Sequence, residues 1–192
     1  MSIRGSVLSP SGRYIVVWQE KPPPGHHILG RLIANQWVTM WDLQTKKQVA
    51  RWRKPEYENI CAAFTKDEKN ILFGSSEGHI RMWSVEKQEI IRDWWVGETT
   101  VDYLQFSNDY RYLAIFGAGK KFHIIIFDYP EGKEVHHFQG FHCVHVEGDP
   151  FPMTFLDTSK FFAFADSDRV CVYDTKTWKE KWCVSSSADD KD

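Results

Sequence analysis

Four short stretches, evenly spaced along the chain, decide the fold: WVTMWD at 37–42, HIRMWS at 79–84, HIIIFD at 123–128 and RVCVYD at 169–174. Each is a mostly apolar run that ends in an aromatic residue followed by a small or acidic one. The closing aromatics are 42, 44 and 46 residues apart along the sequence. A repeat with this period has to be interpreted before any single residue, because it determines the architecture.

A second pattern recurs with the same period: an apolar residue, a polar turn, and another apolar residue seven positions after the first. The pairs are Leu8 and Ile15, Phe64 and Ile71, Phe106 and Leu113, and Phe155 and Phe162. Gly, Asn, Asp and Ser between β-rich runs are typical of hairpin connections. Each unit therefore contains four short strands, which in the second unit we predict at about 59–64, 71–74, 79–84 and 89–95.

Over residues 3–183 the sequence resembles the WD-repeat family. The resemblance lies in the four strands of each unit, the period of about 40 to 45 residues and the Trp-Asp type ending. This resemblance implies an all-β, β-propeller-like array of about four four-stranded antiparallel blades, at about 3–54, 57–96, 99–140 and 150–183. Only the first unit has a literal Trp-Asp, and the family's Gly-His before a blade's first strand is missing. We therefore assign the family's buried His, Ser, Asp and Trp network to no blade. The polar tail at 184–192 is expected to be disordered.

The number of blades is low, because four is the lower bound for closing a propeller and members of the family usually close with seven. We expect an incomplete or partner-completed propeller, in which the flat faces of the first and fourth blades stay exposed. Apolar surfaces of that size are normally covered in water. The alternatives are another copy of the chain, a different chain, or the remainder of a longer protein.

Composition narrows the classes of partner. The chain has 192 residues, with 24 Lys and Arg against 26 Asp and Glu, so its net charge of −2 indicates neither nucleic acid nor an anionic membrane. No apolar stretch is long enough to cross a bilayer and no signal peptide is recognisable, so we expect a cytoplasmic or nuclear protein with no membrane partner. The four cysteines form no C-x-x-C pair, and we expect buried, reduced thiols.

Metal and catalytic patterns are weak. The densest group of metal-capable side chains, His136, His137, His142, Cys143 and His145, matches no closed tetrahedral spacing, and we interpret it as structural or surface histidines. The chain has no Gly-x-Ser-x-Gly elbow, and the sequence GAGK at 117–120 lacks the phosphate-loop spacing. We therefore predict no enzyme, no catalytic residue, no metal and no cofactor.

Binding candidates come from the connections between second and third strands, which the resemblance places on the ligand-facing top of a propeller. The first unit has a proline-rich insertion at 21–31 there, which is either functional or a tolerated surface loop. Trp41, Trp83, Phe127 and Tyr173 are interpreted as core, whereas one of the adjacent residues Trp94 and Trp95 should face outward. The predicted binding residues are His26, Arg31, Glu77, His79, Trp95, Lys120, Lys121, Asp168 and Arg169.

These observations favour a non-catalytic scaffold that binds other proteins of a multi-subunit complex, or a second copy of itself, through top loops and exposed blade faces. The alternative is a module associated with RNA or ribonucleoprotein, in translation or RNA processing. Its support is local: RWRK at 51–54 and the lysines at 120 and 121 could contact phosphates, with aromatic side chains nearby for stacking.

Overall fold

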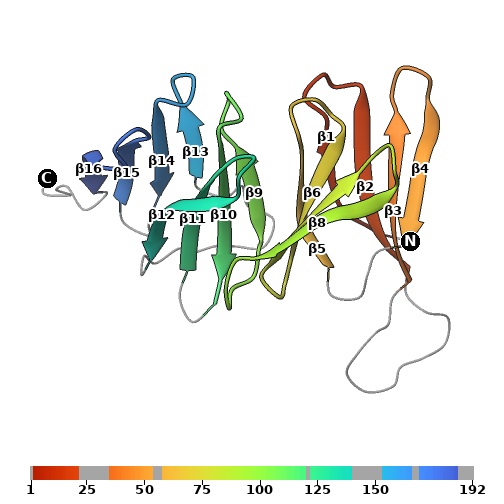
Figure 1. Ribbon diagram of the computed structural model, residues 1–192, viewed down its shortest axis with the longest axis horizontal. Helices are drawn as coiled ribbons and strands as arrows, with labels where there is room; N and C mark the ends of the chain where they lie inside the picture. Colours follow the sequence, from red (N-terminus) through yellow and green to blue (C-terminus); the bar gives the residue numbers. More distant parts are fainter. Residues whose placement is uncertain are drawn as a thin grey trace, which may run out of the picture. The chain divides into compact units, whose positions relative to one another are not determined.

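The computed structural model describes residues 2–21, 35–53, 58–119, 122–139, 153–165 and 169–185. The described chain forms four antiparallel sheets, each built from four consecutive strands (Figure 1). The fold is thus all-β, and the predicted array of four four-stranded blades is confirmed. No helix in these ranges is long and apolar enough to span a membrane.

The strands of the second sheet agree with the prediction to within one residue. The first two sheets comprise β1 (Ser2–Leu8), β2 (Tyr14–Lys21), β3 (Asn35–Asp42), β4 (Lys47–Arg53), β5 (Glu58–Phe64), β6 (Asn70–Ser75), β7 (His79–Ser84) and β8 (Glu89–Trp95). The last two comprise β9 (Tyr103–Phe106), β10 (Tyr112–Ala118), β11 (Phe122–Asp128), β12 (Lys133–Gln139), β13 (Met153–Leu156), β14 (Phe161–Ala165), β15 (Arg169–Asp174) and β16 (Glu180–Ser185).

The hairpin between the third and fourth strands has the same geometry in every sheet. The pairing register shifts directly before the closing aromatic, between Met40 and Trp41 in the first sheet and at the equivalent place in the other three. Each hairpin also has one residue with a positive φ, and these residues are Lys46, Gln88, Gly132 and Trp178. A turn followed by a β-bulge of this kind is a standard way to close a twisted hairpin.

The chain divides into two compact units, residues 1–102 and 103–192. In the first unit, β1 lies beside β5 and the core lies between the first and second sheets. The indole of Trp52 on β4 stacks on that of Trp83 on β7, with ring centroids 3.9 Å apart. The buried core residues are Val16, Trp18, Val38, Met40, Ala50, Phe64, Ile71, Phe73 and Trp83.

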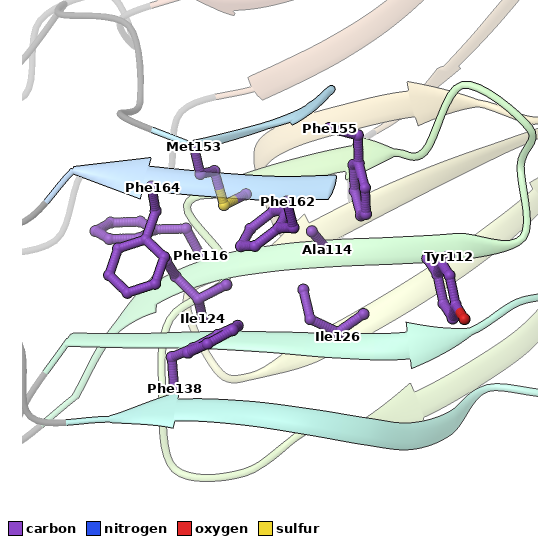
Figure 2. Packing of buried hydrophobic residues seen from close by; sticks show 10 residues of the cluster. All are labelled: Tyr112, Ala114, Phe116, Ile124, Ile126, Phe138, Met153, Phe155, Phe162 and Phe164. Atoms are coloured by element: carbon purple, nitrogen blue, oxygen red, sulfur yellow. The ribbon is translucent and has the colours of Figure 1, made fainter. Parts of the chain in front are cut away.

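The second unit has an equivalent core between the third and fourth sheets, and it is rich in phenylalanine (Figure 2). Phe138 on β12 contacts Tyr173 and Phe164, with ring centroids 4.7 and 5.0 Å apart. The buried residues are Tyr112, Ala114, Phe116, Ile124, Ile126, Phe138, Met153, Phe155, Phe162 and Phe164.

The interpretation of Trp41 as a core residue was wrong. Trp83 is 3% exposed and Phe127 is buried, but Trp41 is 38% exposed and Tyr173 is half-buried. In the second and fourth sheets, the closing aromatic packs against the sheet before it in the sequence. Trp41 lies on the corresponding face of the first sheet, and none of the described sheets buries its indole.

The expectation of reduced thiols was also wrong for two of the four cysteines. Cys171 on β15 and Cys183 on β16 are paired directly across the sheet and form a disulfide, whereas Cys61 is a buried free thiol. The twelve-residue separation gave no sign of this bond, because it depends on the register of the two strands. Cys143 lies outside the described residues.

Candidate protein-interaction site

Three of the predicted binding residues meet at one end of the second sheet. Glu77 lies in the turn between β6 and β7, His79 begins β7, and Trp95 ends β8 directly opposite His79. Trp95 is 60% exposed and Glu77 is exposed, while His79 is half-buried. We call residues 75–79, Trp95 and the following connection 96–102 the sheet-2 platform.

The turn of the platform is held by its own backbone and by one serine. The hydroxyl oxygen of Ser75, which is buried, accepts hydrogen bonds from the backbone N–H groups of Glu77 and His79 at 3.2 and 3.0 Å. The N–H of Val96 donates to the carbonyl of Gly78, and that of Val101 to the carbonyl of Ser75, both at 2.8 Å. The turn and the connection are therefore joined by hydrogen bonds at two points.

Glycine is required at the centre of this turn. Gly78 has a φ of +76°, and a Cβ there would clash with the carbonyl oxygen of Gly97 and lie 2.8 Å from that of Thr99. Behind the turn, the thiol of Cys61 donates to the carbonyl of Val101 at 3.2 Å, and burial raises the pKa of that thiol. Trp95 is therefore presented on a support with little freedom to move.

A charged cluster on β7 and β8 borders the platform. Asp93 accepts hydrogen bonds from the Nδ1 of His79 and the Nε of Arg81, each at 2.8 Å. Burial would raise the pKa of the Asp93 carboxyl, but the hydrogen bonds and the charges of His79 and Arg81 together outweigh burial and lower it. Asp93 therefore holds His79 in place beside Trp95.

The adjacent tryptophans behave as predicted from strand alternation. Trp95 is exposed, whereas Trp94 is half-buried and its ring lies under the guanidinium of Arg92, 4.7 Å from the ring centroid. The prediction that one of the two faces outward is thus confirmed. A role for Trp95 in binding stays a prediction.

A shallow cleft, which the sequence did not reveal, lies in the first unit at the turns between strands. It measures about 550 Å³ and is lined by Arg13, Tyr14, Glu68 and Lys69 among others. Two of its charged groups make contacts that hold neighbouring turns together. Arg13 forms an ion pair with Asp42 at 2.8 Å, and the carboxylate of Glu68 accepts a hydrogen bond from the backbone N–H of Ser11 at 2.6 Å. We interpret the cleft as part of the packing between sheets.

In three of the four sheets, the residue after the closing aromatic caps a turn, as Asp42 shows. Its carboxylate accepts the backbone N–H groups of Thr45 and Gln44 and the guanidinium of Arg13, and these bonds lower its pKa. Asp174 caps the equivalent turn of the fourth sheet, and Ser84 that of the second. The repeated motif thus encodes a turn cap.

The remaining predicted residues are scattered or not described. Arg169 begins β15 at an exposed position in the second unit. His26, Arg31, Lys120, Lys121 and Asp168 lie outside the described residues. The insertion at 21–31 also lies outside them, apart from Lys21 at the end of β2.

The described part of the histidine cluster is a hydrogen-bonded network on β11 and β12. The side-chain amide of Gln139 donates to the Nδ1 of His137 at 3.0 Å, so the Nε2 of His137 carries the proton and donates to the Nδ1 of His123 at 2.9 Å. His136 stacks on Trp178, 5.5 Å between centroids. His142, Cys143 and His145 are not among the described residues.

One group of metal-capable atoms is close together in the described ranges: Cys171, Glu180 and Cys183. Two of these three residues are the disulfide cysteines, whose sulfurs are bonded to each other. Because a thiolate is the ligand form of cysteine, the oxidised pair is not a metal site.

The four-stranded sheets, the repeated hairpin and the packing of one sheet on the next within each unit define a β-propeller-like array of blades. Among solved structures, the chain is similar to a chain of the crystal structure of the mitotic checkpoint complex, with a TM-score of 0.72 and 15% sequence identity. The match covers 96% of this chain and 53% of that one, so this chain spans about half the length of the structure that it matches. No protein-family model and no curated protein sequence matches the chain.

Proposed function

We propose that the protein is a non-catalytic scaffold of the WD-repeat type that binds other proteins in a multi-subunit complex. It does so through the sheet-2 platform and the exposed faces of its terminal sheets. We further propose that it works in the cytoplasm or nucleus.

The observation that carries this proposal is the exposure of Trp95 on a locked support. A large aromatic side chain held at the surface, with polar groups around it, is the usual centre of a protein-binding hot spot. Trp95 is 60% exposed, and Glu77 and His79 supply hydrogen-bonding groups beside it. Because the turn is already ordered, it loses little conformational entropy when a partner binds.

The alternative, binding to RNA, has less support. It needs aromatic rings that are free to stack on bases, next to the basic residues at 51–54. The indole of Trp52 is stacked on Trp83 in the core, and the guanidinium of Arg51 lies over Trp37, 4.1 Å from its centroid. Both rings are already occupied, so we favour a protein partner.

A photo-crosslinking amino acid at position 95 tests the proposal in cells that express the protein. We expect it to trap one or a few partner proteins, because the side chain lies at the centre of the contact. The same amino acid at position 86, in the exposed turn between β7 and β8, is the matched control and should not trap them.

A second variant separates contact from mere proximity. Glu77→Lys reverses a charge at the surface of the platform without touching its backbone bonds, and should reduce the yield of the crosslink at position 95 several-fold. Identical products from positions 95 and 86, unaffected by Glu77→Lys, would contradict the proposal.

A further inference from the structure

Two sheet faces are exposed although their equivalents elsewhere in the described chain are core. We define the forward face of a sheet as the one that packs on the next sheet in the sequence, and the rear face as the one that packs on the sheet before. Within each unit, a forward face packs on a rear face: the first sheet on the second, and the third on the fourth.

The fourth sheet has a complete forward face. The pairing of β15 with β16 places Val170 opposite Val184 and Val172 opposite Trp182. The corresponding positions of the first sheet are Val38, Trp52, Met40 and Ala50, which all pack in the core of the first unit. In the fourth sheet, by contrast, three of the four side chains are exposed: Val170, Trp182 and Val184, at 44, 51 and 60%.

The first sheet has a matching rear face. Leu8, Ile15 and Trp41 lie side by side across β1, β2 and β3. In the second sheet, the equivalent residues are Phe64, Ile71 and Trp83, and each is at most 3% exposed. Leu8 is 56% and Trp41 38% exposed. The side chains of a buried interface are thus present here without a cover.

Both internal interfaces use the same kind of contact. An aromatic on the fourth strand of the forward face meets the closing aromatic of the rear face: Trp52 meets Trp83, and Phe138 meets Tyr173. In the fourth sheet, Val184 stands at the position of Trp52 and Phe138, and Trp182 lies two residues before it on the same face, at the position of Ala50. The two exposed faces, a forward one with Trp182 and Val184 and a rear one with Leu8 and Trp41, are thus the two kinds of face that pack on each other within each unit.

We propose that the forward face of the fourth sheet of one copy binds the rear face of the first sheet of a second copy, and that the same contact repeats at the other end. Such a head-to-tail dimer has two-fold symmetry and covers both exposed faces of each copy. The chain matches 53% of a longer propeller-like chain, so two copies supply about the same length. This inference rests on the proposed function, which also uses the exposed sheet faces, but it does not depend on binding at the sheet-2 platform.

The first test is the mass in solution of the wild type and of two variants, Trp182→Glu and Trp41→Lys. We expect the wild type at about 45 kDa, twice the 22.5 kDa of one chain. Each variant should be a monomer, because each loses one of the two faces that every copy contributes. A monomeric wild type would overturn the proposal.

Mixing the two variants tests the direction of the contact. The Trp182→Glu copy keeps its rear face and the Trp41→Lys copy keeps its forward face, so an equimolar mixture should regain a mass near 45 kDa. A Trp41→Lys variant that remains a dimer would indicate packing of two fourth sheets on each other, and would overturn the head-to-tail arrangement.

Folding of the variants is checked by circular dichroism and by cooperative thermal unfolding, and Trp182→Ala replaces Trp182→Glu if the latter does not fold. The proposed function is read out separately. If the wild type is a monomer while position 95 still traps a partner, the dimer alone is refuted. If the dimer forms and position 95 traps nothing, the scaffold function of the platform fails.

Discussion

At the scale of single residues, Gly78 shows how the fold makes one residue type necessary. We expect Gly78→Ala to destabilise the chain by roughly 3 kcal/mol, because the methyl group meets two carbonyl oxygens in a left-handed backbone conformation. Urea unfolding measures the change.

Gly12→Ala is the matched control for this substitution. Gly12 has nearly the same φ, +71°, but no atom lies within 4 Å of the position of a Cβ. It should therefore cost only the backbone penalty, about 1 to 2 kcal/mol. Equal losses at both positions would mean that the contacts around Gly78 do not matter.

Two histidines of the second unit link stability to pH. Burial lowers the pKa of His123 and of His136, and the nearby His137 lowers both further. The folded chain then binds fewer protons than the unfolded chain, so stability is complete above the ordinary value of about 6.5 and declines as the pH falls below it.

The measurement is the melting temperature from about pH 7.5 to about pH 5.5. His123→Gln keeps an acceptor for the proton of His137 but does not titrate, so its melting temperature should decline less steeply than that of the wild type. A decline as steep as that of the wild type would contradict this account of His123.

Some residues could be predicted and others could not. The outward direction of Trp95 follows from strand alternation, which is local. The exposure of Trp41 does not follow from the sequence pattern, because the repeat predicts the same environment for every closing aromatic. Whether a closing aromatic is buried depends on whether another sheet packs on its face. Asp42 was useful as a marker of the period, and only the structure reveals that it caps a turn.

At the scale of strands and sheets, the closing aromatics give a matched comparison. Trp83→Ala removes a buried indole that stacks on Trp52, and we expect a loss of about 3 to 5 kcal/mol. Trp41→Ala removes the equivalent indole from an exposed face, and in dilute solution it should cost under about 1 kcal/mol. Similar losses in chemical denaturation would contradict the assignment of the first sheet's rear face as open.

The disulfide gives a second prediction at this scale. Denatured without reductant, the chain should show two fewer reactive thiols than the four that it shows after reduction, because Cys171 and Cys183 are joined. Replacing both by serine should lower stability by about 2 to 3 kcal/mol. Four thiols before reduction would refute the bond, and would favour the proposed cytoplasmic or nuclear location, where disulfides are rare.

Strands and hairpins were predictable because their signals are local: apolar residues at alternate positions, and Ser, Asp and Gly in the turns. In the second sheet the predicted and observed strands differ by at most one residue at each end. The disulfide could not be predicted, because it depends on Cys171 and Cys183 being opposite each other in a register that a bulge shifts.

At the scale of the whole molecule, the repeat predicts how many blades the chain contains and which faces are left over. It does not predict what covers them, because the apolar patterns of Leu8, Ile15 and Trp41 are the same whether a sheet lies on them or not. The exposures show which side chains are uncovered, since Leu8 and Trp41 are exposed whereas their equivalents Phe64 and Trp83 are buried.

The measurement that tests this account most directly is photo-crosslinking from position 182, with equal amounts of light and nitrogen-15-labelled chains mixed before irradiation. We predict crosslinked peptides that join residue 182 of one chain to the region around Trp41 or Leu8 of another, with mixed isotope labels. Crosslinks formed only within one chain, or to parts of a second chain outside the first sheet, would contradict the claim that these two faces bind each other.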